Sequence, residues 1–257
     1  MKKTKELIFI FGILTLYLIL LGTSKKIWAA NFMYLKTELF SWHQTEDFAG
    51  RPVNQGILYG IGTQASWRLW KKLNLRITSE ITGNRFDVEK DLGIFRIYEQ
   101  NVEFLMIKVT ADLGWWIELS DSVHLQPYGT FGYHRWLRDV ERYHGLPAYT
   151  QIWRSHFARA GMRIRWNISS DFQSFFEGGL IIPLSNRMKM NEPRVMGRVN
   201  FDNKLSGYGE INLLYKKLLI GFYYEGFRFP ASRNRIDWFI QPRTSIDSYG
   251  LKFGTAF

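Results

Sequence analysis

The last nine residues, Tyr249-Gly250-Leu251-Lys252-Phe253-Gly254-Thr255-Ala256-Phe257, decide the fold. Successive side chains of a β-strand point to opposite faces of the sheet. One face of this segment is bulky and mostly apolar, and it carries Tyr249, Leu251, Phe253, Thr255 and Phe257. The other face is small or charged, with Lys252 at its centre. A small soluble barrel fills its interior with apolar side chains, whereas a barrel in lipid turns them outward. The alternation therefore predicts a membrane-spanning strand.

Nine earlier segments show the same alternation, some less regularly. With the last segment they predict an all-β fold, a ten-stranded antiparallel transmembrane β-barrel over residues 31–257, with eight or twelve strands as alternatives. An even strand number is what a bacterial barrel requires when both ends of the chain lie on the periplasmic side. The nine segments are Phe32–His43, Gly56–Trp70, Leu73–Asn84, Glu103–Leu119, Val123–Trp136, Gln151–Ile168, Phe172–Leu184, Leu205–Lys216 and Leu218–Phe229.

The connections between these segments alternate in length, as the periplasmic turns and outer loops of such barrels do. Short connections fall at Lys71–Lys72, Ser120–Ser122, Ser169–Asp171 and Lys216–Lys217. Long ones are expected near Gln44–Gln55, Arg85–Val102, Leu137–Thr150, Ser185–Lys204 and Pro230–Thr244. Pro127 and Pro183 lie inside two of the segments and weaken those strand assignments, because proline cannot donate a hydrogen bond to the ladder.

The N-terminus has the layout of a secretory signal peptide. Three lysines in Met1–Glu6 precede the apolar run Leu7–Leu21, and cleavage is expected near Ala29 or Ala30. The run is shorter than the roughly 20 residues that a spanning helix needs, so an uncleaved anchor is the lesser alternative. Residues 1–30 are therefore expected to direct export through the Sec pathway. The absence of cysteine from the sequence excludes a disulfide framework and a thiolate metal site.

Charged residues of both signs fall on the inward face of the expected barrel. A shift of one residue would turn them into lipid, at about 2–4 kcal/mol for each Arg or Lys at the midplane. They predict either a lumen filled by ion pairs or an ion path, and Arg159, Arg163 and Arg165 on one segment are candidates for an anion path. The inward set is Lys36, Glu38, Arg68, Arg76, Glu80, Lys108, Asp112, Arg159, Arg163, Arg165, Glu177, Glu210, Glu225 and Lys252.

The leader, the alternating segments and the terminal Phe257 together resemble the outer-membrane β-barrel proteins of Gram-negative bacteria as a class. The resemblance implies insertion by the barrel-assembly machinery, for which Tyr249, Leu251, Phe253 and Phe257 would form the recognition signal. It implies outer-membrane lipid and lipopolysaccharide as partners, and no nucleic acid, cofactor or metal. Basic residues of the last two long loops would lie near lipopolysaccharide head groups: Arg187, Lys189, Arg194, Arg198, Lys204, Arg228, Arg233, Arg235 and Arg243.

The leading functional hypothesis is a non-enzymatic barrel with a filled lumen or a narrow pore and long surface loops. The alternative is an enzyme at the outer rim, either an omptin-like protease or a hydrolase acting on lipid A. Ser155 and His156 are sequence neighbours, so they point to opposite faces of a strand and do not form a catalytic pair. The rim could offer Asp87, Asp91, Asp139, His134, His144 and His156. Tryptophans near the short turns predict an aromatic girdle: Trp67, Trp70, Trp115, Trp116 and Trp166.

Overall fold

A computed structural model describes residues 31–45, 53–91, 96–143, 148–192, 195–201, 204–230 and 243–257. The expected signal peptide, residues 1–30, lies outside this part of the chain. No helix in the described residues is long and apolar enough to cross a membrane. The strands are β1 Phe32–Thr45, β2 Val53–Trp70, β3 Leu73–Asp91, β4 Arg96–Trp115, β5 Ile117–Glu118, β6 Val123–Tyr143, β7 Tyr149–Asn167, β8 Phe172–Glu192, β9 Val195–Phe201, β10 Ser206–Tyr215, β11 Leu218–Phe229 and β12 Arg243–Ala256.

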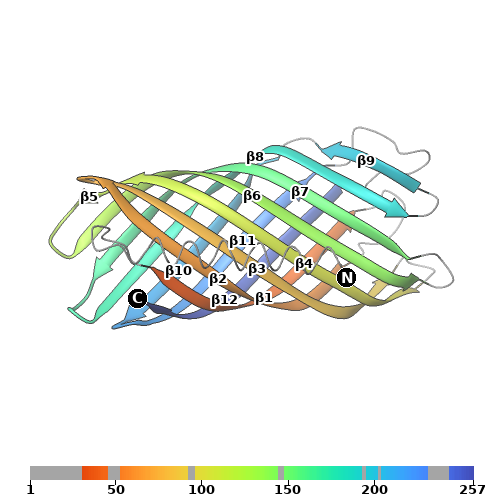
Figure 1. The fold of residues 1–257 in the computed structure, drawn as a ribbon, viewed down its shortest axis with the longest axis horizontal. Coiled ribbons are helices and arrows are strands. Elements are labelled where there is room, and N and C mark those ends of the chain that lie inside the picture. Colours follow the sequence, from red (N-terminus) through yellow and green to blue (C-terminus); the bar gives the residue numbers. More distant parts are fainter. Residues whose placement is uncertain are drawn as a thin grey trace.

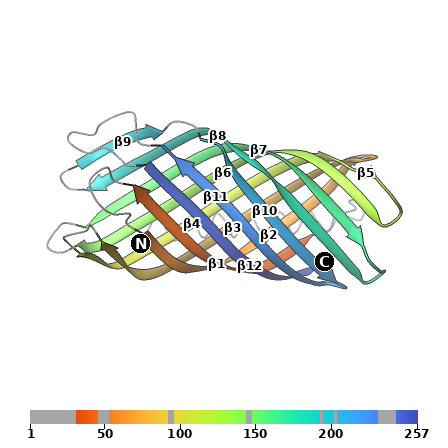
Figure 2. The ribbon, with the colours of Figure 1, turned by 180° about the vertical axis from the view of Figure 1, so that it is seen from behind.

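Ten of these strands close into one antiparallel barrel, as the sequence predicts. The sheet runs β1-β2-β3-β4-β6-β7-β8 and continues through β10, β11 and β12 back to β1. The first strand pairs with the last along its whole length, from Phe32 opposite Ala256 to Thr45 opposite Arg243. The strands tilt strongly along an elongated barrel, and the short turns and the C-terminus gather at one end (Figure 1). Two short strands stand outside this ring: β5 pairs with β6, and β9 pairs with β8 (Figure 2).

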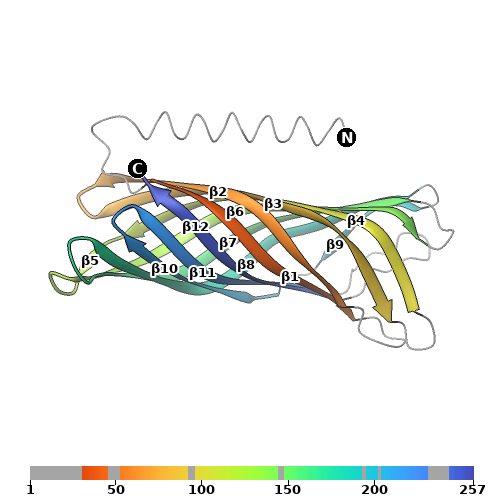
Figure 3. The same ribbon diagram turned by 90° about the horizontal axis from the view of Figure 1, so that it is seen from below.

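The strands are longer at the long-loop end than the sequence analysis expects. The segment Arg85–Val102, expected as a loop, is strand in β3 as far as Asp91 and again in β4 from Arg96. The prediction of a loop over Ser185–Lys204 is also wrong for most of that segment. Strand β8 continues to Glu192, and β9 begins at Val195 and runs back beside it. The hairpins therefore continue past the residues that the apolar alternation marks, at the end of the barrel away from the C-terminus (Figure 3). Residues 231–242 of the last expected loop lie outside the described part.

The sequence analysis misses this extension because the alternation reverses along the barrel: the face that is apolar near the short turns is polar near the long loops. Near the short turns, β7 exposes Met162, Ile164 and Trp166, while Arg163 between them is buried. Towards the long loops, the same strand buries Trp153 and exposes Arg154. The part of the barrel near the long loops thus has the pattern of a soluble barrel, with apolar side chains inside and polar ones outside. The apolar band and the polar extension are two zones of one continuous wall.

The two strand prolines lie where the ladder is interrupted. Pro183 lies opposite Phe157 at a β-bulge between β7 and β8, and on its other side β8 loses its partner between β9 and β10. Because a bulge adds one residue, it reverses which side chains point inward, so buried Ile181 is followed by buried Asn186 and Met188. Pro127 lies where β6 changes partner from β4 to β5. Each proline thus lies where its strand has no partner residue on one side, a position at which a residue without a backbone N–H is tolerated.

Candidate functional site in the barrel lumen

The structure brings twelve of the fourteen inward charges into ion pairs with one another. They form two groups at successive levels of the lumen. The Glu80 network contains Lys36, Glu38, Glu80, Lys108, Arg159, Glu210, Glu225 and Lys252. The Glu177 network contains Arg76, Asp112, Arg163 and Glu177.

Glu80 is the centre of the first network and is only 3% exposed. Its carboxylate accepts from Lys108 Nζ at 2.7 Å, from Lys36 Nζ at 3.0 Å and from the Tyr34 hydroxyl at 2.7 Å. Lys252 Nζ lies 3.5 Å away and donates to Glu210 at 2.7 Å. A buried carboxylate that holds several cations in this way loses its water but gains multiple charge-assisted hydrogen bonds.

One ion pair of this network crosses the whole lumen. Lys108 Nζ on β4 donates to Glu225 Oε2 on β11 at 2.8 Å. Five steps around the ten-stranded ring separate these strands in either direction, so they face each other across the barrel. Glu225 also accepts from Arg159 of β7. The side chains of three walls therefore meet at one point inside the barrel.

The Glu177 network lies nearer the short turns. Arg76 donates to Glu177 from both terminal nitrogens, at 2.7 and 2.8 Å. It also donates to Asp112. Arg163 donates from Nε to Glu177 at 2.8 Å. Tyr128 donates to Glu177 at 2.7 Å, and its oxygen lies 2.5 Å from that of Tyr208. Each carboxylate here has at least two guanidinium or hydroxyl donors, so neither is buried without hydrogen-bond partners.

Both networks are electrically neutral when each side chain carries its ordinary charge. The Glu80 network has four cations and four carboxylates, and the Glu177 network has two of each. The two remaining members of the predicted inward set, Arg68 and Arg165, belong to neither network. Both lie close to the short turns.

On the long-loop side of the networks, aromatic rings occupy the lumen. Trp136 of β6 packs edge-on against Phe227 of β11, with ring centroids 5.1 Å apart, and lies 3.7 Å from the His134 ring. Trp153 of β7 stacks on Phe201 of β9 at 5.0 Å. Trp136 and Trp153 are each 1% exposed. We call this set, with Phe157 and Phe229, the aromatic layer.

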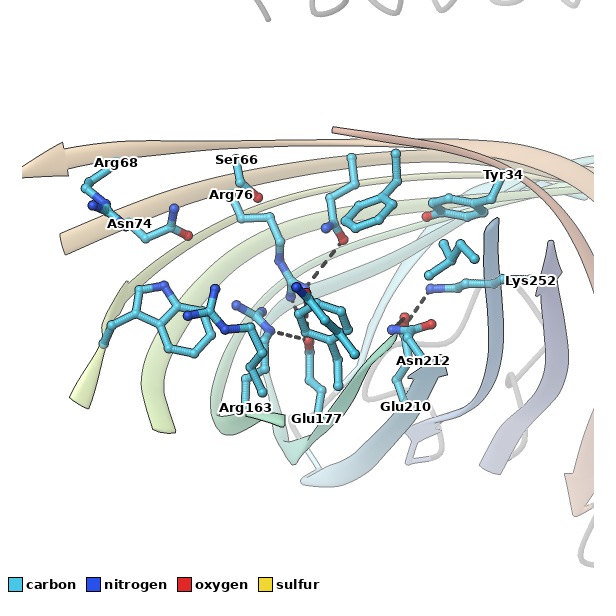
Figure 4. Close-up of a pocket in the computed structure, with 17 residues that line it drawn as sticks. Tyr34, Ser66, Arg68, Asn74, Arg76, Arg163, Glu177, Glu210, Asn212 and Lys252 are labelled. Atoms are coloured by element: carbon cyan, nitrogen blue, oxygen red, sulfur yellow. Dashed lines mark hydrogen bonds and ion pairs between the residues drawn. The ribbon is translucent and has the colours of Figure 1, made fainter. Parts of the chain in front are cut away.

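On the short-turn side, the lumen opens into a cavity of about 590 Å³, which we call the cup. Figure 4 shows Arg163 and Arg76 around Glu177, and Lys252 beside Glu210. Five basic side chains and two carboxylates line the cup, together with Gln64, Asn74, Gln173 and Asn212. Trp116 also lines it, which corrects one expectation: Trp116 points into the lumen and does not belong to the outer girdle, whereas Trp70, Trp115 and Trp166 are exposed on the wall.

The rim candidates for catalysis do not converge among the described residues. His134 is buried inside the barrel, whereas His156 lies on the outer wall, with its ring 5.1 Å from that of Tyr133. Asp139 accepts from Thr150 at 2.8 Å and faces outward. His144 and the side chains of Asp87 and Asp91 lie outside the described residues. Within those residues no group of three or more His, Asp or Glu side chains could hold a metal ion.

Some contacts in the lumen carry no signal in the sequence. Tyr34, Tyr128 and Tyr223 lie on inward positions and donate to Glu80, Glu177 and Glu38 respectively. Alternation places each of them inward, but it does not say which carboxylate each one reaches. The residues predicted as an assembly signal lie on the outer wall from the middle of β12 to the C-terminus, with Tyr249, Phe253 and Phe257 about half exposed.

A closed ten-stranded barrel with an apolar outer band and a charged lumen defines an outer-membrane β-barrel protein, and a solved structure of this class shares the fold. The outer membrane protease OmpT from Escherichia coli matches with a TM-score of 0.55 and 9% identity, over 91% of this chain and 96% of that chain. Neisserial surface protein A matches with a TM-score of 0.33 and 10% identity, over 86% and 95%. Ail of Yersinia pestis matches with a TM-score of 0.32 and 11% identity, over 89% and 99%. No protein-family model and no curated protein sequence matches the chain.

Proposed function

We propose that this protein is a non-enzymatic barrel of the outer membrane with a non-conducting lumen, whose long hairpins present a surface outside the cell. The observation that carries the proposal is the ion pair between Lys108 and Glu225 on opposite walls, within the neutral Glu80 network. The space beside this pair is about 10 Å³, room for no more than about one water molecule, so we expect no continuous water column at that level. The aromatic layer adds a second, apolar level of closure.

The balance of charge argues against an ion path as the purpose of the lumen. A selective path needs charges that the permeant ion can neutralise, whereas Arg159 and Arg163 already have Glu225 and Glu177 as partners. OmpT is a protease by its name. In the part of this chain that the structure describes, the rim histidines and aspartates do not lie close to one another. The non-enzymatic hypothesis therefore remains the better supported one.

Side chains on the outer wall indicate which end of the barrel faces the outside of the cell. Arg135, Arg154 and Arg187 lie directly opposite one another on β6, β7 and β8, and they point outward. None of the three forms an ion pair within the described part of the chain. Like charges directly opposite in a sheet are destabilising, so this arginine row favours an anionic partner.

The arginine row lies at the height where a head group would be. One step towards the short turns, Tyr133 and His156 form an aromatic pair on the wall, and the next step carries exposed Phe131 and Ile182. The order from apolar to aromatic to basic is that of a membrane interface. We therefore place the long hairpins on the lipopolysaccharide side, with the arginine row contacting phosphates.

Single-channel recording in a planar bilayer tests the proposal. The protein, extracted from the outer membrane of an expressing host, is compared with a widened variant that carries Lys108→Ser, Glu225→Ser, Trp136→Ala and Phe227→Ala. A control variant carries four changes on the outer wall of the same strands: Val109→Ala, Tyr133→Ala, Phe222→Ala and Tyr224→Ala. We expect no conductance steps from the parent or the control, and small steps from the widened variant.

Steady conductance from the parent would contradict the proposal. In that case, a variant with Arg159, Arg163 and Arg165 all changed to Gln would test the anion path, since its anion preference should fall. Folding of each variant is checked beforehand by heat-modifiable migration on a gel, so that silence is not mistaken for loss of the barrel.

A further inference from the structure

A groove lies on the outer wall of the barrel, over the neighbouring strands β7, β8, β10, β11 and β12 (Figure 2). Its volume is about 950 Å³, at the upper end of the usual range for small-molecule sites, about 300–1,000 Å³. The floor is bare backbone, because Gly178 of β8 and Gly209 of β10 lie opposite each other. Both face outward, since Glu177 and Glu210 beside them point into the lumen. Apolar side chains of the lipid-facing band surround this floor: Met162, Ile164, Phe176, Ile211, Phe222 and Leu251.

The barrel itself does not use the space above these two glycines. Among the described residues, a Cβ atom at Gly178 would have its nearest neighbour at 3.4 Å, and one at Gly209 at 3.8 Å. Inward glycines differ, because a Cβ atom at Gly62 would collide with the Tyr34 ring that fills that place. Glycine inside a strand weakens the strand. Two open glycines side by side at the bottom of a groove therefore indicate that a molecule from outside the barrel occupies it.

The groove is closed towards the short turns and open towards the long loops. On the short-turn side, large side chains stand in one row on three adjacent strands, with Phe176 opposite Ile211 and Ile211 opposite Phe222. On the long-loop side, the next outward position of β10 is Gly207. A Cβ atom there would again have its nearest described neighbour at 3.7 Å. A bound molecule therefore reaches the floor from the long-loop side.

Aromatic and charged residues follow the groove on this open side. Along β11 the outward positions pass from Phe222 to Tyr224 and then to Arg228. Tyr224 packs against Tyr249, with ring centroids 5.0 Å apart, and donates to Asp247 at 2.8 Å. Arg228 donates to the same carboxylate at 2.6 Å. The order from apolar to aromatic to charged is that of a membrane interface, so the groove lies beneath the head groups of the leaflet on the long-loop side.

The width and the chemistry of the groove fit a hydrocarbon chain. Strands β8 and β11 flank β10, and with about 4.8 Å between neighbouring strands they are about 10 Å apart. Their side chains narrow the opening further, so an α-helix, about 10–12 Å across, does not enter. A polymethylene chain, whose carbon atoms contact others at about 3.5–4.0 Å, does. The backbone of the floor pairs with strands on both sides and leaves no hydrogen-bonding group for a polar ligand.

We infer that this groove binds one acyl chain of lipopolysaccharide, which lies along β10 over Gly207 and Gly209 and ends against Ile211. The chain contacts the barrel on its floor and both sides, whereas a chain elsewhere on the wall contacts it on one side only. The additional dispersion contacts hold it longer than the surrounding lipid. The identity of the lipid rests on the orientation in the proposed function, which places lipopolysaccharide in the long-loop leaflet.

Retention of lipid through purification tests this inference. Barrels are extracted from the outer membrane of an expressing host and washed in detergent, and the lipopolysaccharide and phospholipid that stay bound are measured per barrel by mass spectrometry. Every protein compared carries the arginine row changed to Gln, so that the row does not contribute to retention. Filling the groove with Gly178→Leu and Gly209→Leu should lower the retained lipopolysaccharide about fivefold or more.

The matched control is Gly129→Leu on β6. Gly129 also faces outward with open space above it, 4.0 Å from its nearest described neighbour, but it lies outside the groove. Its change should leave the retained lipid as it is. Folding is checked by heat-modifiable migration, and Gly209→Leu alone replaces the double change if the latter does not fold.

The groove is overturned as a lipid site if filling it leaves the retained lipid unchanged, or if Gly129→Leu lowers retention as much. Loss of phospholipid in place of lipopolysaccharide would overturn the assignment of the lipid and, with it, the proposed orientation. The closed lumen is tested separately by conductance, so its failure is distinguishable from failure of the groove.

Discussion

Neutralising Glu80 should be the most damaging conservative change in the barrel. Glu80→Gln keeps the shape of the side chain but removes the charge that holds Lys36, Lys108 and Lys252. Seven members of the Glu80 network then remain, four cations and three carboxylates, all inside the barrel. Removing one partner of a buried ion pair costs about 3–5 kcal/mol, because the other charge is left uncompensated.

The assay is reversible urea unfolding of the folded barrel in detergent or lipid vesicles. With a urea slope of about 1–3 kcal/mol per molar, the Glu80→Gln change should lower the midpoint by at least about 1 M. The matched control is Glu103→Gln on the outer wall of β4. Glu103 is 42% exposed and lies 3.7 Å from Arg85, so its loss should cost no more than about 1 kcal/mol.

A second variant tests whether charge balance is the cause. Glu80→Gln combined with Lys108→Gln restores neutrality, and Glu225 keeps Arg159 as its partner. The double variant should be more stable than Glu80→Gln alone. The reasoning is refuted if Glu80→Gln unfolds within 1 kcal/mol of the parent, or if removing Lys108 as well lowers stability further by the full cost of a second buried charge.

Three further changes test other parts of the account. Gly132→Ala would place a Cβ atom against the Phe157 ring and should lower the free energy of unfolding by about 1–3 kcal/mol in the same assay. Gly209→Ala on the outer wall should cost almost nothing, because the nearest atom to its new Cβ would be 3.8 Å away. Ile164→Lys in the apolar band should lower stability in vesicles by up to about 2–4 kcal/mol, and equal stability of Ile164→Lys and Ile152→Lys would contradict the proposed band. Changing the whole arginine row to Gln should reduce stabilisation by added lipopolysaccharide in a thermal melt, and an equal reduction on neutralising three short-turn lysines would contradict the head-group site: Lys71, Lys216 and Lys217.

The wall of the barrel could be predicted from sequence because alternation is a local property. The strand Leu218–Phe229 was predicted with the bounds that β11 has. At the long-loop end, the predicted strands stop short of the observed ones, where the wall leaves the apolar band. There Trp136 points inward and Arg135 outward, which reverses the alternation that identifies the membrane strands. A search for both senses of alternation would extend the prediction into the hairpins.

The connections across the lumen could not be predicted in the same way. Which way Arg76 and Glu177 point follows from alternation, but that they meet depends on how far each strand is shifted along its neighbour around the ring. Those two residues are 101 positions apart, and Lys108 and Glu225 are 117 apart. The neutrality of each network becomes visible only after these contacts are known.

The most direct test of the account is a nitroxide scan along β3, which is possible because the chain has no cysteine of its own. A spin label is attached singly at outward positions 75, 77 and 81 and at inward positions 78 and 82, in protein reconstituted into lipid vesicles. The account predicts high accessibility to oxygen, which is concentrated in lipid, at Leu75, Ile77 and Ile81, and low accessibility at Thr78 and Thr82. Equal accessibility at all five positions, or the reverse order, would contradict a lipid-embedded barrel with a tightly packed charged interior.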